Sequence, residues 1–342
     1  MTDRVDDVEQ LEDLLSEPTD GVVETMARLE GDVVFLGVGG KMGPTLARMA
    51  RRASQQAGVR RRVIGVSRFS SPAVQQRLET HGIETIRCDL LDRSRLDALP
   101  EVPNVVYMAA MKFGTTGREA TTWAMNAYLP GMVCEKFHAA RIVAFSTGNV
   151  YAMTPVDRGG SLETDPPQPD GEYGMSCLGR ERIFSYFSAA REIPVALIRL
   201  NYANELRYGT LVDLGQRVAA GEPIDLTMGH FNAIWQGDAN AMVLRALDHT
   251  AVPPRVINIA GLETLSVRRV AEQFGELFGK PVEFSGTEAP DALLSNGQLG
   301  SELLGRPRVT LDQMVRRIAD WLSRGGETLG KPTHFQVRDG KF

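Results

Sequence analysis

Three residue types are scarce in this sequence of 342 residues, and each scarcity narrows what the protein can be. The three cysteines and the five histidines are scattered along the chain, so they form neither a disulfide framework nor a metal-ligand spacing. We therefore expect no structural metal. Lysine is also rare, with 6 residues against 32 arginines, which makes the position of each lysine informative.

Long apolar stretches and basic clusters are absent as well. No run reaches the length of a membrane span, and the acidic N-terminus does not have the pattern of a signal peptide. With a net charge of -5 and no basic run, the sequence gives no support to a nucleic-acid groove or an anionic membrane surface. We expect a cytoplasmic globular protein whose ligand is a small molecule, because 43% hydrophobic and 24% charged residues are ordinary values for that class.

The stretch DVVFLGVGGKMGPTLARMARRA, residues 32–53, combines a short strand, a glycine turn and a helix. Asp32 to Leu36 is apolar and bounded by glycine, and apolar residues at helical spacing follow from Met42. Glycine lets the backbone turn tightly, and the first N–H groups of a helix are unpaired donors for a phosphate. The sequence therefore predicts a dinucleotide site at this turn, made by Gly37, Gly39, Gly40, Lys41, Met42 and Gly43.

Strand and helix patterns then alternate as far as Leu200. Such alternation forces parallel strands joined by helical crossovers, which predicts an α/β protein with a doubly wound parallel sheet that binds ligands at the carboxyl ends of its strands. The predicted strands are Asp32–Leu36, Arg61–Ser67, Ile83–Leu90, Asn104–Ala110, Arg141–Thr147 and Pro194–Leu200. One predicted helix between them begins at Met42. The other three are Ala73–Thr80, Thr121–Ala140 and Tyr173–Arg191.

The two ends of the chain follow different patterns. Residues 1–30 predict a helical extension, which we expect to pack on the domain or on a partner subunit. Residues 201–228 and 261–342 predict a smaller C-terminal substrate lobe, and segments near 229–260 are expected to return to the main domain of residues 31–200. The lobe's predicted elements are helices near Thr210–Ala220, Asp238–His249, Val267–Phe278 and Leu311–Ser323 and a strand at Arg255–Ala260. The final residues, KPTHFQVRDGKF, have no predicted place.

Six motifs in this order resemble those of the extended short-chain dehydrogenases, the NAD(P)-dependent epimerase/dehydratase family. The similarity runs from about Asp32 to Leu322 and implies a Rossmann-type fold, but it names no substrate because many functions share this fold. The motifs are the GxxGxxG of Gly37, Gly40 and Gly43, the pairs Asp89-Leu90 and Ala109-Ala110, STGNVY at Ser146–Tyr151, YGMSCLGRE at Tyr173–Glu181, and LLSNGQLGSELLGRPRVTL at Leu293–Leu311.

The resemblance assigns catalytic roles and exposes one departure. It implies that Thr147 hydrogen-bonds the substrate oxygen and that Tyr173 transfers the hydroxyl proton, assisted by a lysine four residues further on. That position holds Cys177, and a neutral thiol cannot lower the pKa of the tyrosine from its ordinary value of about 10. Lys112, which follows the fourth predicted strand, is our candidate substitute, and Arg180 is a weaker one.

Two other solutions to the missing lysine stay open. The enzyme can work as a reductase, where a protonated Tyr173 is the form required, or the protein can bind the cofactor without redox chemistry. Cys177 itself is expected to be a small buried hydrophobe and not a nucleophile.

The end of the second strand bears on cofactor choice. An acidic residue there binds the ribose of NAD, whereas this chain has Ser67 and Arg68, which suit the 2′-phosphate of NADP. Lys41 would add a second charge, although both basic residues can equally be solvated surface groups. We predict NADP, with NAD possible, and the resemblance adds Asp89, Leu90, Ala109, Ala110 and Tyr173 to the cofactor site.

The segment RLNYANELRYG, Arg199 to Gly209, offers hydrogen-bonding groups after the sixth strand. We predict substrate contacts from Thr147, Asn149, Asn201 and Tyr202, and an NADP-dependent oxidoreductase or epimerase/dehydratase acting on a carbohydrate, sugar acid or nucleotide sugar. The alternative is a non-catalytic NADP-binding regulator that senses redox state. Surplus apolar residues on two long helices predict a homodimer: Trp123, Met125, Leu129, Met132 and Val133, and Leu178, Ile183, Phe184, Tyr186 and Phe187.

Overall fold

The computed structural model describes residues 4–112, 117–338 and 340. Seven strands form one parallel sheet in the order β12-β7-β5-β4-β1-β2-β3. The predicted fold class is confirmed, and the strand order reverses between β1 and β4. The strands are β1 (Val33–Leu36), β2 (Val63–Ser67), β3 (Glu84–Arg87), β4 (Asn104–Tyr107), β5 (Arg141–Thr147), β7 (Val195–Leu200) and β12 (Arg255–Ile259).

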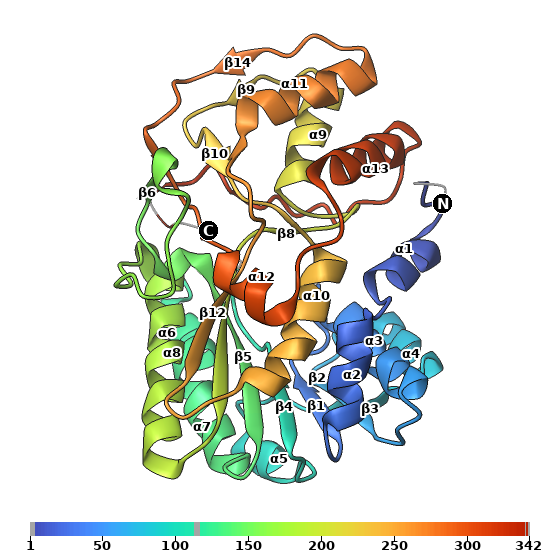
Figure 1. Cartoon of the computed structure of the whole chain (residues 1–342), viewed down its shortest axis with the longest axis vertical. Helices are drawn as coiled ribbons and strands as arrows, with labels where there is room; N and C mark the ends of the chain where they lie inside the picture. The colour runs from blue at the N-terminus through green and yellow to red at the C-terminus, as the bar shows by residue number, and fades with distance from the viewer. Residues whose placement is uncertain (1–3, 113–116, 339, 341–342) are drawn as a thin grey trace.

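Both faces of the sheet are buried, as continuous apolar runs in parallel strands require. Val33 and Phe35 of β1 point into one core cluster, and Val34 and Leu36 point into the other. Helices cover the two faces of the sheet in Figure 1. They are α3 (Gly43–Gln56), α4 (Pro72–Thr80), α5 (Arg93–Asp97), α6 (Glu119–Trp123), α7 (Leu129–Lys136), α8 (Gly171–Arg191) and α10 (Gln236–Arg245).

A smaller lobe lies above the carboxyl ends of the strands in Figure 1. Its helices are α9 (Thr210–Ala220), α11 (Val267–Phe278), α12 (Gln298–Leu304), which packs beside β12, and α13 (Leu311–Ser323). Two-residue strands connect them: β6 (Thr154–Pro155), β8 (Ala203–Asn204), β9 (Ile224–Asp225), β10 (His230–Phe231), β11 (Ile234–Trp235), β13 (Leu265–Ser266), β14 (Phe284–Ser285) and β15 (Asp291–Ala292). Short 3-10 helices span Gly148–Val150, Val156–Arg158 and Ala246–His249.

The predicted long helix at Thr121–Ala140 is not one continuous α-helix. A π-helical turn, η1 (Ala124–Tyr128), separates α6 from α7. Pro130 has no N–H, so the carbonyl of Asn126, four residues earlier, loses its helical donor. The Nε of Arg180 donates to that carbonyl instead, at 3.3 Å.

The N-terminal extension forms two helices that contact both parts of the molecule. Leu11 and Leu15 of α1 (Val8–Leu15) are buried in the core of the smaller lobe, whereas Val22 and Met26 of α2 (Asp20–Arg28) join the core beside the sheet. The buried residues of α1 and α2 thus pack against described parts of the same chain, without a partner subunit. The boundaries of the proposed domains stay a prediction.

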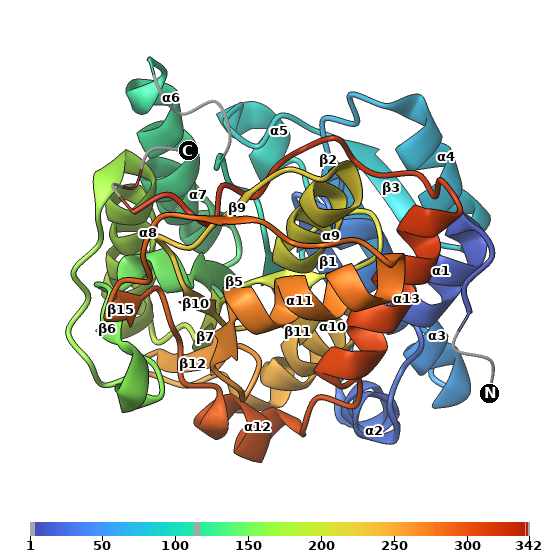
Figure 2. The same cartoon turned by 90° about the horizontal axis from the view of Figure 1, so that it is seen from above.

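The segment after α13 has a defined path. In Figure 2 it runs back across the molecule from α13 toward α8. Phe335 is buried in the core of the smaller lobe, and Arg338 forms an ion pair with Asp291. A Cβ on Gly171, the first residue of α8, would lie only 2.4 Å from the carbonyl oxygen of Gly340, so the segment reaches the start of that helix.

Candidate functional site

A pocket of about 260 Å³ opens at the carboxyl ends of the strands, between the sheet and the smaller lobe. It lies where the strand order reverses, which is the usual ligand position in a doubly wound sheet. Of the predicted site residues, the pocket brings together Gly37, Gly40, Lys41, Met42, Ala110, Lys112, Thr147, Asn149, Tyr173, Asn201 and Tyr202. Gly39, Gly43, Ser67, Arg68, Asp89, Leu90 and Ala109 do not line it.

The glycine turn fits a dinucleotide. Gly37 has a φ of 93°, and a Cβ there would lie 2.7 Å from the backbone of Ala109. A Cβ on Gly43 would lie 2.1 Å from the carbonyl oxygen of Val38. Only glycine therefore allows the turn to pack this closely between β1 and the start of α3. That helix has no side-chain cap and no acidic residue in its first turn, so its terminal N–H groups are available to a pyrophosphate.

The residues expected at the adenosine half lie along neighbouring strand ends. Ser67 ends β2 with its hydroxyl beside Gly39, and Arg68 follows it as an exposed side chain. Asp89 follows β3 and accepts a hydrogen bond from the amide of Leu91 at 3.2 Å, so it caps its own loop. These positions are compatible with a cofactor that extends from the glycine turn across β2.

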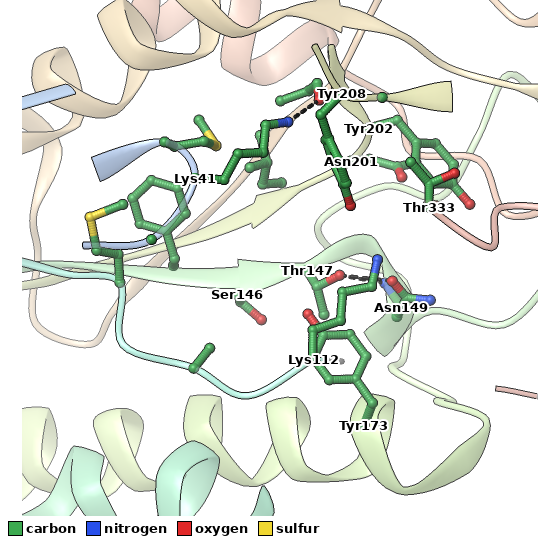
Figure 3. A pocket seen from close by; sticks show the side chains of 18 of the residues that line it. Lys41, Lys112, Ser146, Thr147, Asn149, Tyr173, Asn201, Tyr202, Tyr208 and Thr333 are labelled. Atoms are coloured by element: carbon green, nitrogen blue, oxygen red, sulfur yellow. Dashed lines mark hydrogen bonds between the residues drawn. The ribbon is translucent and has the colours of Figure 1, made fainter. Parts of the chain in front are cut away.

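Lys41 points away from this half. Its Nζ donates a hydrogen bond to the carbonyl oxygen of Ala203 at 3.0 Å and lies 4.0 Å from the ring centre of Tyr208 (Figure 3). Both contacts belong to the smaller lobe. The NADP prediction placed Lys41 together with Arg68. In this structure the two side chains do not act together, because the Lys41 amine contacts Ala203 and Tyr208. Its amine faces the pocket that holds Tyr173.

Thr147 and Tyr173 meet at the pocket floor. Thr147 ends β5 and donates its hydroxyl to Oδ1 of Asn149 at 2.9 Å, which fixes both side chains. Tyr173, in the first turns of α8, forms a hydrogen bond with Thr147. The neighbouring Ser146 is engaged elsewhere, since its hydroxyl donates to Glu181 at 2.6 Å. The arrangement leaves Thr147 and Tyr173 as the hydroxyl groups at the candidate reacting centre.

The surroundings of Tyr173 favour the protonated phenol. Burial raises the pKa of Tyr173 far above its usual value, and Cys177 raises it further, while Arg180 and the bond with Thr147 act in the opposite direction. Cys177 is fully buried and packs with Val150 and Tyr151 against the Tyr173 ring. Burial also raises the pKa of the Cys177 thiol, so it is neutral near pH 7 and supplies no charge.

Lys112, the candidate substitute for the missing lysine, lies beside the ring of Tyr173. Its Nζ lies 5.8 Å from the centre of the Tyr173 ring, and in Figure 3 the side chain extends past that ring toward Thr147 and Asn149. Burial lowers the pKa of Lys112 to about 8. A buried amine beside a phenol can hold a proton at neutral pH and stabilise negative charge on the phenolic oxygen.

The π-helical turn fixes the backbone next to Lys112. Asn126 accepts a hydrogen bond from the amide of Met111 at 2.9 Å and donates to its carbonyl at 3.0 Å. The same side chain donates to Ser176 on α8 at 2.9 Å. One amide group thus ties the loop that carries Lys112 to the helix that carries Tyr173.

Arg180, the weaker candidate, is held in place by hydrogen bonds to Phe145 and Asn126. Its guanidinium donates to the carbonyl of Phe145 at 2.8 Å and to both oxygens of Asn126 at 3.3 and 2.8 Å. It is buried at 2% exposure, so it cannot swing toward Tyr173 without leaving those acceptors unpaired.

The upper wall of the pocket comes from the smaller lobe. Asn201 donates to Ser295 at 3.2 Å, and Tyr202 adopts a φ of 45°, unusual for a bulky residue. Sequence reasoning missed Tyr208 and Thr333, which also line the pocket. Tyr208 lies in the RLNYANELRYG segment that was singled out, but no local pattern marks Thr333, because only the path of the final segment brings it there.

In residues 4–112, 117–338 and 340, no group of three or more His, Cys, Asp or Glu side chains could hold a metal ion. No helix within the same ranges is long and apolar enough to cross a membrane.

Comparison with known proteins identifies relatives of the fold and the sequence. The model of the NAD dependent epimerase/dehydratase family matches residues 33–260. No curated protein matches the chain. Among solved structures, MoeE5 in complex with UDP-glucose and NAD is similar with a TM-score of 0.69 and 21% identity, covering 86% of this chain and 99% of its own.

Two epimerase structures are similar to the same extent. UDP-glucuronic acid 4-epimerase from Bacillus cereus, in complex with UDP-glucuronic acid and NAD, has a TM-score of 0.70 and 19% identity, over 86% of this chain and 99% of its own. UDP-glucose 4-epimerase from Thermotoga maritima, with UDP-glucose, has a TM-score of 0.69 and 17% identity over the same shares. At these identities the similarity shows a common fold.

Proposed function

The chain belongs to the NAD dependent epimerase/dehydratase family, and we propose from this that it is an NAD(P)-dependent oxidoreductase or epimerase acting on a carbohydrate, sugar acid or nucleotide sugar. The observation that carries the proposal is the meeting of Thr147, Tyr173 and Lys112 in one pocket with the glycine turn. The neighbours crystallised with UDP-sugars and NAD support the same class of chemistry.

In this proposal the glycine turn and strand ends bind the cofactor, and Thr147 and Tyr173 act on the substrate. The glycine turn and the start of α3 hold the cofactor's pyrophosphate, and the strand ends at Ser67–Arg68, Asp89–Leu90 and Ala109–Ala110 hold its remaining length. When bound, NAD(P) supplies the acceptor or donor of a hydride. Thr147 hydrogen-bonds the substrate oxygen, and Tyr173 moves the proton to or from that oxygen.

The protonation state of Tyr173 sets the preferred direction. Its raised pKa keeps the phenol protonated at neutral pH, which is the form that donates a proton to a substrate carbonyl oxygen. Proton removal from a substrate hydroxyl needs the phenolate, which burial disfavours and which the positive charges of Arg180 and of the nearby Lys112 would stabilise. We therefore expect reduction of a carbonyl to be faster than oxidation of the alcohol at pH 7.

Cofactor preference follows from the end of β2. Arg68 is exposed, no carboxylate lies within ion-pair distance of it in the described part of the chain, and no acid follows β2 to contact a ribose. An arginine of this kind pairs with the 2′-phosphate, so we propose NADP as the preferred cofactor.

One observation favours a second function. Cys177 replaces the charged residue expected beside Tyr173 and raises the tyrosine pKa instead of lowering it. A protein with this defect and an intact glycine turn can serve as a non-catalytic NADP-binding regulator that senses redox state.

The test is cofactor reduction and oxidation against a panel of sugars, sugar acids and nucleotide sugars, with Tyr173→Phe as the control. Turnover that requires Tyr173 supports the enzyme. NADPH binding without turnover on any member of the panel, in either direction, supports the regulator and overturns the enzyme.

A further inference from the structure

The side chains that line the pocket include basic residues but no acidic ones among the described residues. Among the described residues that line it, Lys41, Lys112 and Arg180 are basic and none is Asp or Glu. The chain as a whole has the opposite balance, with 43 acidic against 38 basic residues. A basic pocket in an acidic protein concentrates anions and favours an anionic ligand.

The amine of Lys41 is held by uncharged groups. It contacts the carbonyl oxygen of Ala203 at 3.0 Å and the face of the Tyr208 ring at 4.0 Å. In the described ranges no carboxylate lies within ion-pair distance of it. The Lys41 side chain thus extends from the glycine turn to the smaller lobe, where its amine contacts only uncharged groups among the described residues.

The acids that face Lys41 are already engaged. Glu205 pairs with Arg207 at 3.2 Å, and Asp213 accepts two hydrogen bonds from Thr333. A buried ammonium that contacts only uncharged groups is less favourable than one that is paired with an anion. Burial accordingly lowers the pKa of Lys41 to about 7. A bound anion would remove this penalty.

The two lysines approach the pocket from both sides of the point where the strand order reverses. Lys41 follows β1 and Lys112 follows β4, the adjacent strand. Lys112 lies beside Thr147 and Tyr173, so an anion held between the amines would be next to the reacting centre (Figure 3). Asn149 and Asn201, also in the pocket lining, offer neutral partners for hydroxyl groups.

The pocket has room for the reacting part of a ligand. At about 260 Å³ it is below the range of roughly 300–1,000 Å³ that accommodates drug-sized ligands. The nicotinamide ring must share this volume with the substrate. A single sugar unit is the part of the substrate that this volume has to hold beside the ring.

We propose that the substrate is a sugar acid, a small polyhydroxylated carboxylate whose carboxylate group is bound by Lys41 and Lys112. The hydroxyl or carbonyl group on a neighbouring carbon then faces Thr147 and Tyr173. This proposal rests on the proposed function and selects one substrate class within it.

The test compares acids with neutral molecules of nearly the same shape. Isothermal titration calorimetry measures binding to the full-length protein saturated with NADPH. The acids are D-glucuronate, D-galacturonate, D-gluconate and D-xylonate, and the neutral comparison for each acid is its primary amide. UDP-glucuronate is titrated as well. The variants are Lys41→Met and the control Lys280→Met. Lys280 is exposed, and its amine also donates to a backbone carbonyl, that of Ala219, so the control removes the same charge outside the pocket.

We expect at least one acid to bind 10-fold or more tightly than its amide. Lys41→Met should weaken that acid by about 10- to 100-fold, the range for a hydrogen bond between charged groups, and should leave the amide and NADPH unchanged. Lys280→Met should change neither.

Other results overturn the proposal. They are equal binding of acid and amide, no binding by any of the acids, binding by UDP-glucuronate alone, or a Lys41→Met variant that loses NADPH affinity and not acid affinity. In the last case the cofactor's pyrophosphate is the anion at Lys41. Turnover of neutral sugars without acid preference would remove this proposal and keep the proposed function, whereas acid binding without turnover would keep the carboxylate site alone and remove both the substrate assignment and the proposed function.

Discussion

Thr333 donates its backbone amide and its hydroxyl to the same carboxylate oxygen of Asp213, at 2.8 and 2.6 Å, although 120 residues separate the two. Asp213 lies in the first turn of α9, and Thr333 belongs to the segment after α13. The pair therefore fastens the end of the chain over the pocket, where Thr333 forms part of the wall.

Thr333→Val should destabilise the protein by roughly 1.5–3 kcal/mol, because a hydrogen bond to a partly buried carboxylate is lost. Urea unfolding measures the change. Thr328→Val is the matched control, since Thr328 lies in the same segment and makes only a 3.4 Å contact with Gln216. Equal stabilities of the two variants would show that the Asp213 contact does not hold the segment.

The second prediction concerns the amine beside Tyr173. Lys112→Met should lower turnover and shift its pH profile, because it removes an amine that lies 5.8 Å from the centre of the Tyr173 ring, and far-UV circular dichroism should be unchanged. Tyr173→Phe should abolish turnover and spare cofactor binding, since the phenol acts on the substrate proton alone. Initial rates against pH for both variants provide the measurement.

Cys177→Lys completes this comparison. If nothing replaces the missing lysine, the new amine should create or raise activity. With Lys112 in place, a second cation would be repelled and would also have to enter a fully buried site, so we expect no gain. A rate and pH profile that survive Lys112→Met would remove Lys112 from its role and favour the regulator.

The sequence predicted local structure well where one element determines its own pattern. The strand Arg141–Thr147 and the helices Thr210–Ala220, Val267–Phe278 and Leu311–Ser323 have the predicted bounds. Each has an apolar repeat that the core then buries. The interrupted helix at η1 was missed because its cause is a contact between Pro130, Asn126 and Arg180, and Arg180 lies on another helix.

The site was predictable to the extent that it follows strand ends. Thr147, Tyr173, Asn201 and the glycines could be placed because motifs fix their position on the fold. The direction of Lys41 and the presence of Thr333 depend on how the smaller lobe closes over the sheet. No local pattern encodes such a long-range arrangement.

The third prediction concerns cofactor choice. The protein should bind NADPH about 10- to 100-fold more tightly than NADH, through an arginine–phosphate pair at Arg68. Arg68→Ala should remove the difference and leave NADH affinity unchanged, as measured by fluorescence titration. Arg60→Ala is the control, because Arg60 is exposed at the opposite end of β2. Equal affinities in the wild type would exclude the assignment.

The fourth prediction is a homodimer about the face formed by α6, η1 and α8. Of the apolar residues expected there, Leu129, Met132, Val133 and Phe184 are buried within the subunit. Trp123 is 38% exposed and Tyr186 65%, and Tyr128, also 65% exposed, adds to them. Exposed aromatic residues on adjacent helices are typical of a subunit interface.

Tyr128→Glu combined with Tyr186→Glu should give a monomer, because a two-fold contact would bury four added charges. Leu262→Glu, at a residue 42% exposed in the smaller lobe, should leave the assembly unchanged. Sedimentation at micromolar concentration distinguishes the species. A wild-type protein that sediments only at 37.5 kDa would contradict the interface.

The last prediction is the pH dependence of acid binding. Lys41 and Lys112 have pKa values lowered by burial to about 7 and about 8, so each amine is protonated below its value and neutral above it. The titratable groups that act on Lys41 are Glu205, Lys112, Arg207 and Asp213, and those that act on Lys112 are Asp213 and the Cys177 thiol, which is neutral over most of this range. A carboxylate binds the protonated amines.

The affinity for a sugar acid should therefore be nearly constant between pH 5.5 and 6.5 and should fall as the pH rises through about 7 and about 8. The sign follows because deprotonation removes the positive charge while the substrate carboxylate, with an ordinary pKa of about 4, stays ionised throughout. Titration calorimetry across this range, in two buffers of different ionisation enthalpy, should also show proton uptake on binding near pH 7.5. Lys41→Met should lose the lower of the two transitions and keep the upper one. An affinity that does not change up to pH 9 would mean that neither amine binds the carboxylate.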